Sequence, residues 1–160
     1  MEGYNGFVLS TTFVHLLAAC TWLGGMIYIN LIFMPMLKTI DPSAAGQLVR
    51  ENGKRFPKIA WASVGFLIIT GLMQLNLDAV FDFSTDYGTF LTMKLITIVV
   101  MISIGLYITF LLYPKLIKAA PQNGETPSAE FLSLQKRLPL LARINMILGI
   151  LVLFFVSMII

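Results

Sequence analysis

The chain has 160 residues, of which 58% are hydrophobic and 12% are charged, whereas an ordinary soluble domain carries about 25% charged residues. Its mean hydropathy of +0.86 leaves too little polar surface for a soluble fold, so the composition predicts an integral membrane protein. The net charge of +3 does not indicate a nucleic-acid partner, because the basic residues are sorted by membrane side and report topology.

Four windows without acidic or basic side chains, apart from a protonated His15, are each near the length that crosses a bilayer. About 20 apolar residues span a hydrocarbon core ~30 Å thick. The windows cover residues 3–37, 59–77, 95–114 and 144–160. With their flanking residues they predict transmembrane helices over about residues 6–37, 57–77, 87–118 and 130–160.

The windows are apolar on all sides and do not alternate, which excludes a transmembrane β-barrel. The predicted fold is therefore an all-α integral membrane four-helix bundle that forms a single domain, residues 1–160. Between the first two helices, Asp41-Pro42 is typical of an N-cap with proline at the first helical position. It opens a short segment, residues 43–54, that we place at the inner membrane surface, so that the second helix enters the membrane at Pro57.

An acidic loop precedes the third predicted helix, and a connection rich in Pro, Gly and polar residues, 119–127, follows it. That connection ends in Thr126-Pro127, which we predict to be a second N-cap with a proline in the first turn. The fourth helix then begins at Ser128 or at Pro139 and runs to the end of the chain.

The basic residues of the connections are concentrated in two of them. The first and third connections carry bases, whereas the N-terminus and the second connection carry acids, so the positive-inside bias predicts that both chain termini face outward across the plasma membrane. The bases of the first and third connections are Lys38, Arg50, Lys54, Arg55 and Lys58, then Lys115, Lys118, Lys136, Arg137 and Arg143, and the acids of the N-terminus and the second connection are Glu2, Asp78, Asp82 and Asp86.

An internal repeat relates the first and third helices. His15 precedes Pro35 by 20 residues, and Lys94 precedes Pro114 by 20. Tyr28 and Tyr107 each precede their proline by seven, and Lys54-Arg55-Phe56-Pro57 matches Lys136-Arg137-Leu138-Pro139. We predict two parallel helical hairpins related by a pseudo-two-fold axis along the membrane normal. The alternative is that two unrelated membrane hairpins share prolines and basic loops by chance.

The polar side chains inside the spans define a candidate site near the outer face. His15 and Lys94 would each lie ~10 Å below the outer boundary at 1.5 Å per residue, and Gln74 falls in a similar layer. Ser63, Thr70 and Gln74 are spaced seven and four residues apart and so share one helix face, which we expect to look inward, towards a partner or a cavity. A charged lysine at a helix centre costs about 2.5 to 3.5 kcal/mol, so Lys94 either faces a partner or a wet cavity, or extends to the outer headgroups.

His15 shares a helix face with Ala18, Ala19, Trp22 and Met26. Neutral imidazole is the commonest metal ligand in proteins, so His15 is a candidate ligand of a metal ion or of haem iron. The alternative is a histidine that only makes a hydrogen bond inside the bundle. We place Lys94, Gln74 and Trp22 beside it as candidate polar or cofactor-binding partners.

Methionine supplies the other soft donors, and copper(I) favours thioether ligands. The candidate soft ligands are Met73, Met93, Met26 and Met101. The alternative is that these side chains fill gaps or face lipid. A single His, a single Cys and the lack of acids within the windows leave hydrolytic chemistry unsupported.

The stretch His15-Leu-Leu-Ala-Ala-Cys-Thr-Trp22-Leu-Gly-Gly25, with its apolar continuation to Pro35, resembles the first helix of the CopD-type copper-resistance membrane domain. The resemblance continues through Lys54-Arg55-Phe56, Thr70-Gly71, Tyr87-Gly88 and Lys94-Leu95. It covers nearly the whole chain and implies copper uptake or export.

The chain is also distantly similar to the HemJ-type protoporphyrinogen oxidases, which share a first-helix histidine, a following tryptophan and a third-helix lysine. In that family the histidine and the lysine are essential and haem b is a cofactor. The resemblance therefore implies essential roles for His15 and Lys94. The chain departs from it at Phe33-Met34-Pro35-Met36, where the oxidases have Leu-Pro-Arg followed by a second histidine.

Three functions stay open at this point. The first is copper handling, with His15 and methionine side chains as ligands at a site near the outer face. The second is a b-type haem redox protein, with His15 as axial ligand and Lys94 paired with a propionate or acting as second ligand. The third is a non-catalytic subunit of a homo-oligomer or a larger membrane complex, and the sequence leaves open whether the chain is an enzyme.

Overall fold

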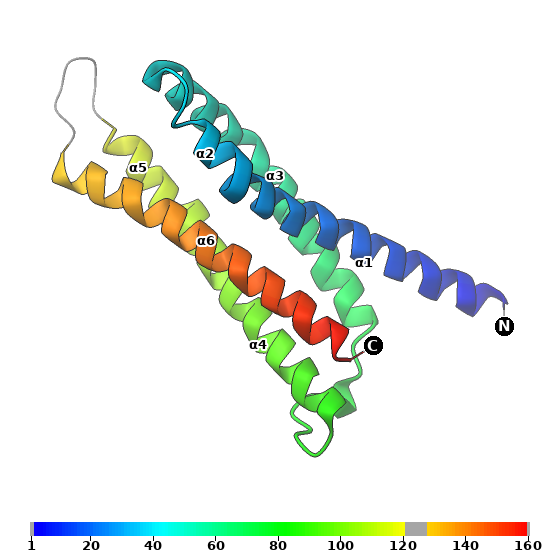
Figure 1. Ribbon diagram of the computed structural model, residues 1–160. Coiled ribbons are helices and arrows are strands. Elements are labelled where there is room, and N and C mark those ends of the chain that lie inside the picture. The colour runs from blue at the N-terminus through cyan, green and yellow to red at the C-terminus, as the bar shows by residue number, and fades with distance from the viewer. Residues whose placement is uncertain (1, 121–127, 160) are drawn as a thin grey trace. The chain divides into compact units, whose positions relative to one another are not determined.

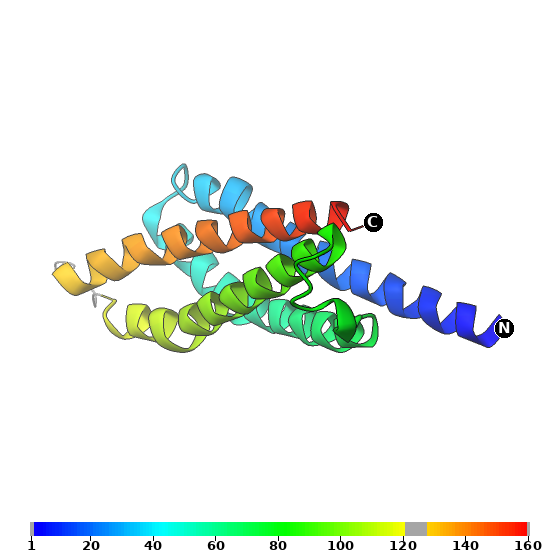
Figure 2. The ribbon, with the colours of Figure 1, turned by 90° about the horizontal axis from the view of Figure 1, so that it is seen from below.

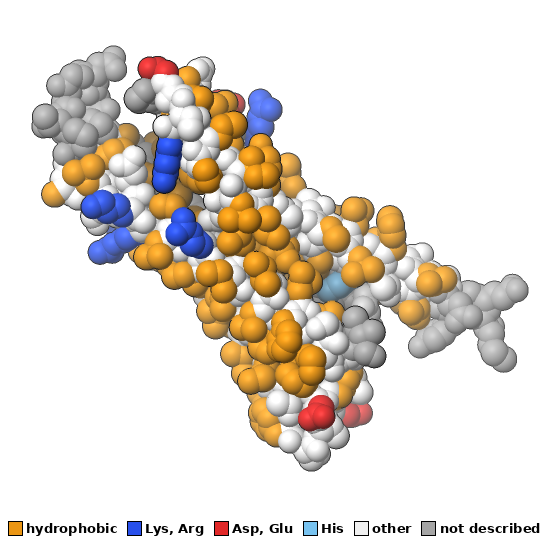
Figure 3. Space-filling view, viewed as in Figure 1, with side chains coloured by type: hydrophobic (Ala, Val, Ile, Leu, Met, Phe, Trp, Pro, Cys, Tyr) orange, Lys and Arg blue, Asp and Glu red, His pale blue; other side chains and the backbone are white. Residues whose placement is uncertain are grey.

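The computed structural model describes residues 2–120 and 128–159, and over these residues it contains helices and connections without any strand. Four helical stretches are long and apolar enough to cross a membrane, at Gly6–Met36, Ala44–Met73, Asp86–Lys118 and Ala129–Ser157. The all-α, multi-pass prediction is confirmed. Figure 3 shows hydrophobic side chains over much of the visible helix surface, as expected where helices meet lipid.

The chain divides into two compact units, Met1–Leu77 and Asp78–Ile160. In the first unit α1 (Glu2–Tyr28) packs on α3 (Pro42–Met73), and in the second α4 (Asp86–Leu106) packs on α6 (Ala129–Ser157). Figures 1 and 2 show each pair as two antiparallel helices. The prediction that the two pairs form one bundle, related by a two-fold axis, stays a prediction.

The first helix of each unit has a π-helical turn directly before its proline. In the first unit the turn covers Ile29–Phe33 and precedes α2 (Met34–Met36), and the Met34 N–H bonds to Ile29 O, five residues earlier. Proline lacks an N–H and its ring crowds the carbonyl four residues before it. The wider turn relieves that crowding without ending the helix.

The second unit has the same kind of π-helical turn before its proline. There the π-helical turn covers Tyr107–Leu112 and precedes α5 (Tyr113–Lys118), with the Tyr113 N–H bonded to Ile108 O. The third predicted helix, 87–118, is confirmed over this whole stretch. Each turn ends two residues before its proline, at Phe33 and at Leu112, and the repeat as a whole stays a prediction.

The second predicted helix needs a correction. A separate segment at 43–54 and a helix start at Pro57 were wrong, because α3 is one helix that begins at Pro42 and continues through Pro57. Its N-terminus is capped as predicted, since the Ala44 N–H donates to the Asp41 carboxylate at 3.2 Å. Lys54-Arg55-Phe56 offers no turn residue, and a proline inside a helix removes one hydrogen bond without forcing an end.

The end of α3 also differs from the prediction. The helix stops at Met73, four residues before Leu77. The N–H groups of Gln74 and Leu75 each bond three residues back, to Gly71 O and Leu72 O, both at 3.3 Å. These bonds tighten the last turn and leave Gln74 outside the helix.

Polar caps set the starts of the other two long helices. Thr85 accepts a hydrogen bond from Gly88 N at 3.1 Å and begins α4, and Ser128 accepts one from Phe131 N at 3.1 Å and begins α6. The fourth helix therefore follows the earlier of its two predicted starts and ends at Ser157, slightly short of the predicted 160. The predicted cap at Thr126-Pro127 lies outside the described residues.

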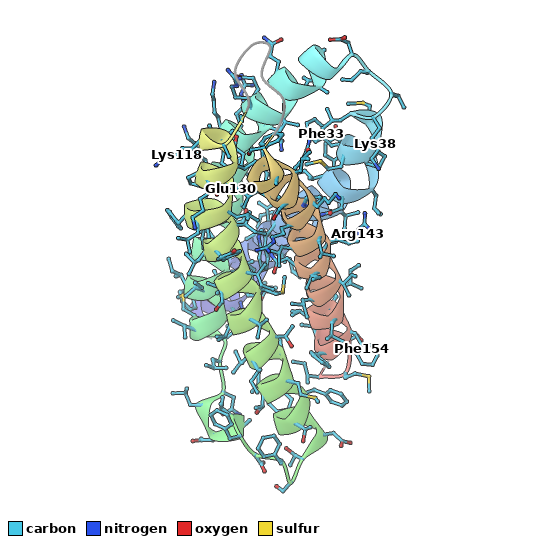
Figure 4. The ribbon with its side chains drawn as sticks, turned by 90° about the vertical axis from the view of Figure 1, so that its left-hand side faces the viewer. Phe33, Lys38, Lys118, Glu130, Arg143 and Phe154 are labelled. Atoms are coloured by element: carbon cyan, nitrogen blue, oxygen red, sulfur yellow. The ribbon has the colours of Figure 1, made fainter. Side chains whose placement is uncertain are left out.

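Charge is distributed unevenly along α6. Figure 4 places Glu130 at the beginning of α6, near the Lys118 end of α5, and Phe154 near its other end, with Arg143 between them. Beyond Arg143 the helix carries no acidic or basic side chain. Two aromatic rings hold this apolar end against α4, since the Phe90 and Phe155 ring centroids are 6.2 Å apart.

The loop before α4 is held against that helix by polar groups. Phe81, with a positive φ of 64°, donates its N–H to the buried Thr92 hydroxyl at 2.9 Å. The Asp82 carboxylate accepts hydrogen bonds from the Ser84 hydroxyl and the Ser84 N–H, which hold the pKa of Asp82 below its ordinary value. Gly88 fits beneath the loop, because a Cβ at that position would lie 2.8 Å from Ala79 O.

Candidate functional site

His15 meets α3 near the C-terminal end of that helix. The imidazole Nδ1 lies 2.7 Å from the Thr70 hydroxyl oxygen, a hydrogen bond that joins α1 to α3 across 55 residues of sequence. His15 is half-buried and Thr70 is only 6% exposed. The contact therefore lies within both membrane-spanning stretches of the first unit, where water competes little for the bond.

The Thr70 hydroxyl makes a second hydrogen bond. Its oxygen lies 2.6 Å from the carbonyl oxygen of Phe66, one turn earlier on α3. A carbonyl oxygen can only accept, so the hydroxyl proton points toward Phe66. Thr70 thus connects the imidazole of α1 to the backbone of α3.

The imidazole lies against the backbone of α3 beside this bond. A Cβ at Gly71 would stand 3.4 Å from the His15 Cε1 atom, so glycine leaves the ring room to lie close to the helix. On the His15 face of α1, Ala18 and Met26 are buried and Trp22 is half-buried. The predicted face of α1 is the one that packs on α3.

A second close approach fixes how α1 and α3 are aligned. Gly25 faces the Phe56 ring, and a Cβ at Gly25 would lie only 2.7 Å from the Phe56 Cε2 atom. The neighbouring Gly24 is exposed, and a Cβ there would meet nothing within 4 Å. The close approach of Gly25 to Phe56 and the hydrogen bond between His15 and Thr70 therefore both contribute to the alignment of the helix pair.

Gln74 does not share the buried face on which it was predicted. Ser63 and Thr70 are both buried as expected, but Gln74 is exposed in the turn after Met73. Residues spaced seven and four apart share a face only where the helix continues, and α3 ends before Gln74. Thr70, which the sequence placed on an inward face without linking it to the histidine, is the residue that contacts His15.

Lys94 lies in the second unit, in the third turn of α4. It is half-buried, and its neighbours Leu91 and Thr92 are almost completely buried. Within the described residues Lys94 forms no ion pair. Because His15 and Lys94 belong to different units, their predicted meeting stays a prediction.

The four candidate methionines fall into two groups. Met26 is buried and Met101 is 0% exposed, so both fill the interior of their own units. Met73 and Met93 are exposed, at 52% and 46%. Met73 follows Thr70 by three residues on α3, which places it within one turn of the imidazole contact.

Chemically, this arrangement offers one imidazole that is held by a hydrogen bond, and the thioether of Met73 belongs to the residue three positions after Thr70 on the other helix. The residues that the structure describes contain no group of three or more His, Cys, Asp or Glu side chains placed to hold a metal ion. Nitrogen and thioether sulfur are donors that suit copper(I).

Comparisons with known proteins relate the chain to a family of membrane proteins. The family model described as "Copper resistance protein D" matches residues 50–159, which include most of α3 and the whole helical part of the second unit. An uncharacterised protein of Aquifex aeolicus is 35% identical over 66 residues, which cover 41% of this chain and 46% of that protein. No solved structure matches the chain. The resemblance to the HemJ-type oxidases is not borne out.

Proposed function

The chain belongs to the CopD (copper resistance protein D) family, and from that premise we propose that it handles copper inside the membrane through a site built on His15. The observation that carries the proposal is the imidazole held by Thr70 at 2.7 Å between two membrane-spanning helices. Copper is the cargo of such a protein, not a resident cofactor. A polar group in a span is costly and is typical of an ion pathway.

The donors near His15 favour copper(I). Imidazole nitrogen and thioether sulfur bind this ion better than they bind hard cations such as Mg²⁺. Met73 lies within one turn of Thr70 and supplies the thioether from α3. In the proposed site His15 and Met73 bind the ion from adjacent helices, and Trp22 shields the inner side on the His15 face.

The distribution of charge supports an orientation for this site. Bases lie toward the Phe56 end of α3 and acids lie in the loop before α4, so the positive-inside bias places His15 nearer the outer face than the cytoplasm. The proposed protein therefore handles copper from the outer side of the plasma membrane, with both termini outside.

Metal content and pigment of the purified protein test the proposal. The full chain is produced in cells supplied with both copper and haem precursor, purified in detergent, and measured by elemental analysis and visible absorbance. We expect about one copper ion per chain, as a single soft site requires, and no Soret band. A Soret band would favour the haem alternative, and protein with neither copper nor haem would favour a non-catalytic subunit.

A further inference from the structure

We infer that Thr70 is a positioning residue that keeps the proton of the neutral His15 imidazole on Nδ1 and so gives Nε2 the lone pair that a soft metal ion binds. The inference rests on the proposed copper site for its functional consequence. Its structural part, the identity of the protonated nitrogen, holds for the protein without metal.

The hydrogen bonds around Thr70 permit only one consistent arrangement of protons. The Thr70 hydroxyl has a single proton, and its oxygen lies 2.6 Å from Phe66 O and 2.7 Å from His15 Nδ1. Phe66 O can only accept. If the hydroxyl donated to His15 instead, two acceptor oxygens would face each other at the shorter distance without a proton between them.

The hydroxyl therefore donates to Phe66 O and accepts from the Nδ1–H group of His15. A neutral imidazole carries one proton, so its lone pair lies on Nε2. Hydrogen-bonding partners of the second ring nitrogen commonly fix the tautomer and orientation of metal-binding histidines. A threonine that is bonded to its own backbone performs this role here from the neighbouring helix.

The packing of the ring keeps the same edge toward α3. The Cε1 atom lies beside Gly71, where a Cβ would approach it to 3.4 Å, and Nδ1 is bound to Thr70. A ring flip would replace Nδ1 by a carbon atom and break the bond to Thr70, a residue that is 6% exposed. Losing a hydrogen bond is more costly where its polar groups are buried than where they are exposed to water.

Substitutions at Thr70 separate the hydroxyl from the shape of the side chain. Thr70→Val keeps the branched shape and removes the hydroxyl, and we expect it to weaken copper(I) affinity about 10-fold to 100-fold, as loss of such a partner does elsewhere. Thr70→Ser keeps the hydroxyl and should retain the affinity. Thr21→Val is the control, because the Thr21 hydroxyl bonds only within α1, to Leu17 O at 2.8 Å.

The tautomer is measured directly by nitrogen NMR. His15 is the only histidine in the chain, so protein labelled with ¹⁵N-histidine gives one imidazole spectrum. It is recorded without metal, well above the ordinary histidine pKa of about 6.5. We expect the proton on Nδ1 in the natural protein and in the Thr70→Ser and Thr21→Val variants, and a shift of the proton toward Nε2 in Thr70→Val.

The outcomes distinguish this inference from the proposed function. A proton on Nε2 in the natural protein overturns the inference, whether or not the protein binds copper. A proton on Nδ1 together with no copper binding keeps the structural inference and rejects the copper site. Should Thr70→Val fail to fold, the natural protein and Thr70→Ser still decide the result.

Discussion

The His15→Ala variant is expected to lose copper while remaining folded. The imidazole is the only nitrogen ligand that the proposed site has, so its removal leaves a thioether alone to hold the ion. The Thr70 hydroxyl keeps its bond to Phe66 O in this variant, so the loss of the bond from His15 does not leave that hydroxyl without an acceptor. A single lost hydrogen bond costs about 0.5 to 1.5 kcal/mol.

Competition with a coloured copper(I) chelator measures this loss, and thermal unfolding of the same samples checks the fold. The Ser10→Ala variant is the matched control, because the Ser10 hydroxyl is exposed and bonds to Gly6 O at 2.8 Å on the same helix. If His15→Ala bound copper as tightly as Ser10→Ala does, the ligand would not be His15.

The Gly25→Leu variant is expected to lose both stability and copper affinity. A Cβ at Gly25 would lie 2.7 Å from the Phe56 ring, so a leucine must push α1 and α3 apart or displace the ring. Overpacking of this kind costs about 1 to 3 kcal/mol. Separation of the helices would also lengthen the bond between His15 and Thr70, which is why the copper affinity should fall too.

The neighbouring Gly24 provides the comparison. A Cβ there meets nothing within 4 Å, so Gly24→Leu adds an apolar side chain on an exposed face and should unfold at or above the temperature of the natural protein. Both variants are compared by thermal unfolding in the same detergent. If the Gly24→Leu and Gly25→Leu variants unfolded at the same temperature, α1 and α3 would not be aligned through Gly25 and Phe56.

The membrane spans could be predicted from sequence because charge-free windows and capping residues mark them. Asp41 begins a helix where the sequence indicated, and Ser128 is the earlier of the two starts that the sequence left open for the fourth helix. The start of the second helix could not be predicted in this way. Pro57 looks like a helix boundary in the sequence, but the helix continues on both sides of it. Composition alone does not decide whether a helix starts at a proline or continues through it.

The candidate site was only partly predictable. His15 is conspicuous as the single histidine in an apolar span. Its partner depends on how two apolar helices are aligned, which is set by the Gly25–Phe56 and His15–Gly71 contacts and not by any charge pattern. Spacing alone put Gln74 with Thr70, but the helix ends at Met73, so Thr70 lies on the helix face that meets the imidazole and Gln74 lies beyond the end of the helix.

X-ray absorption at the copper K-edge of the copper-loaded protein tests most directly that His15 holds the ion. An imidazole ligand gives a recognisable multiple-scattering pattern, and the chain has one histidine to produce it. We predict that pattern together with at least one sulfur neighbour, and its loss in His15→Ala. Copper bound by sulfur or oxygen without any imidazole would contradict the proposed site.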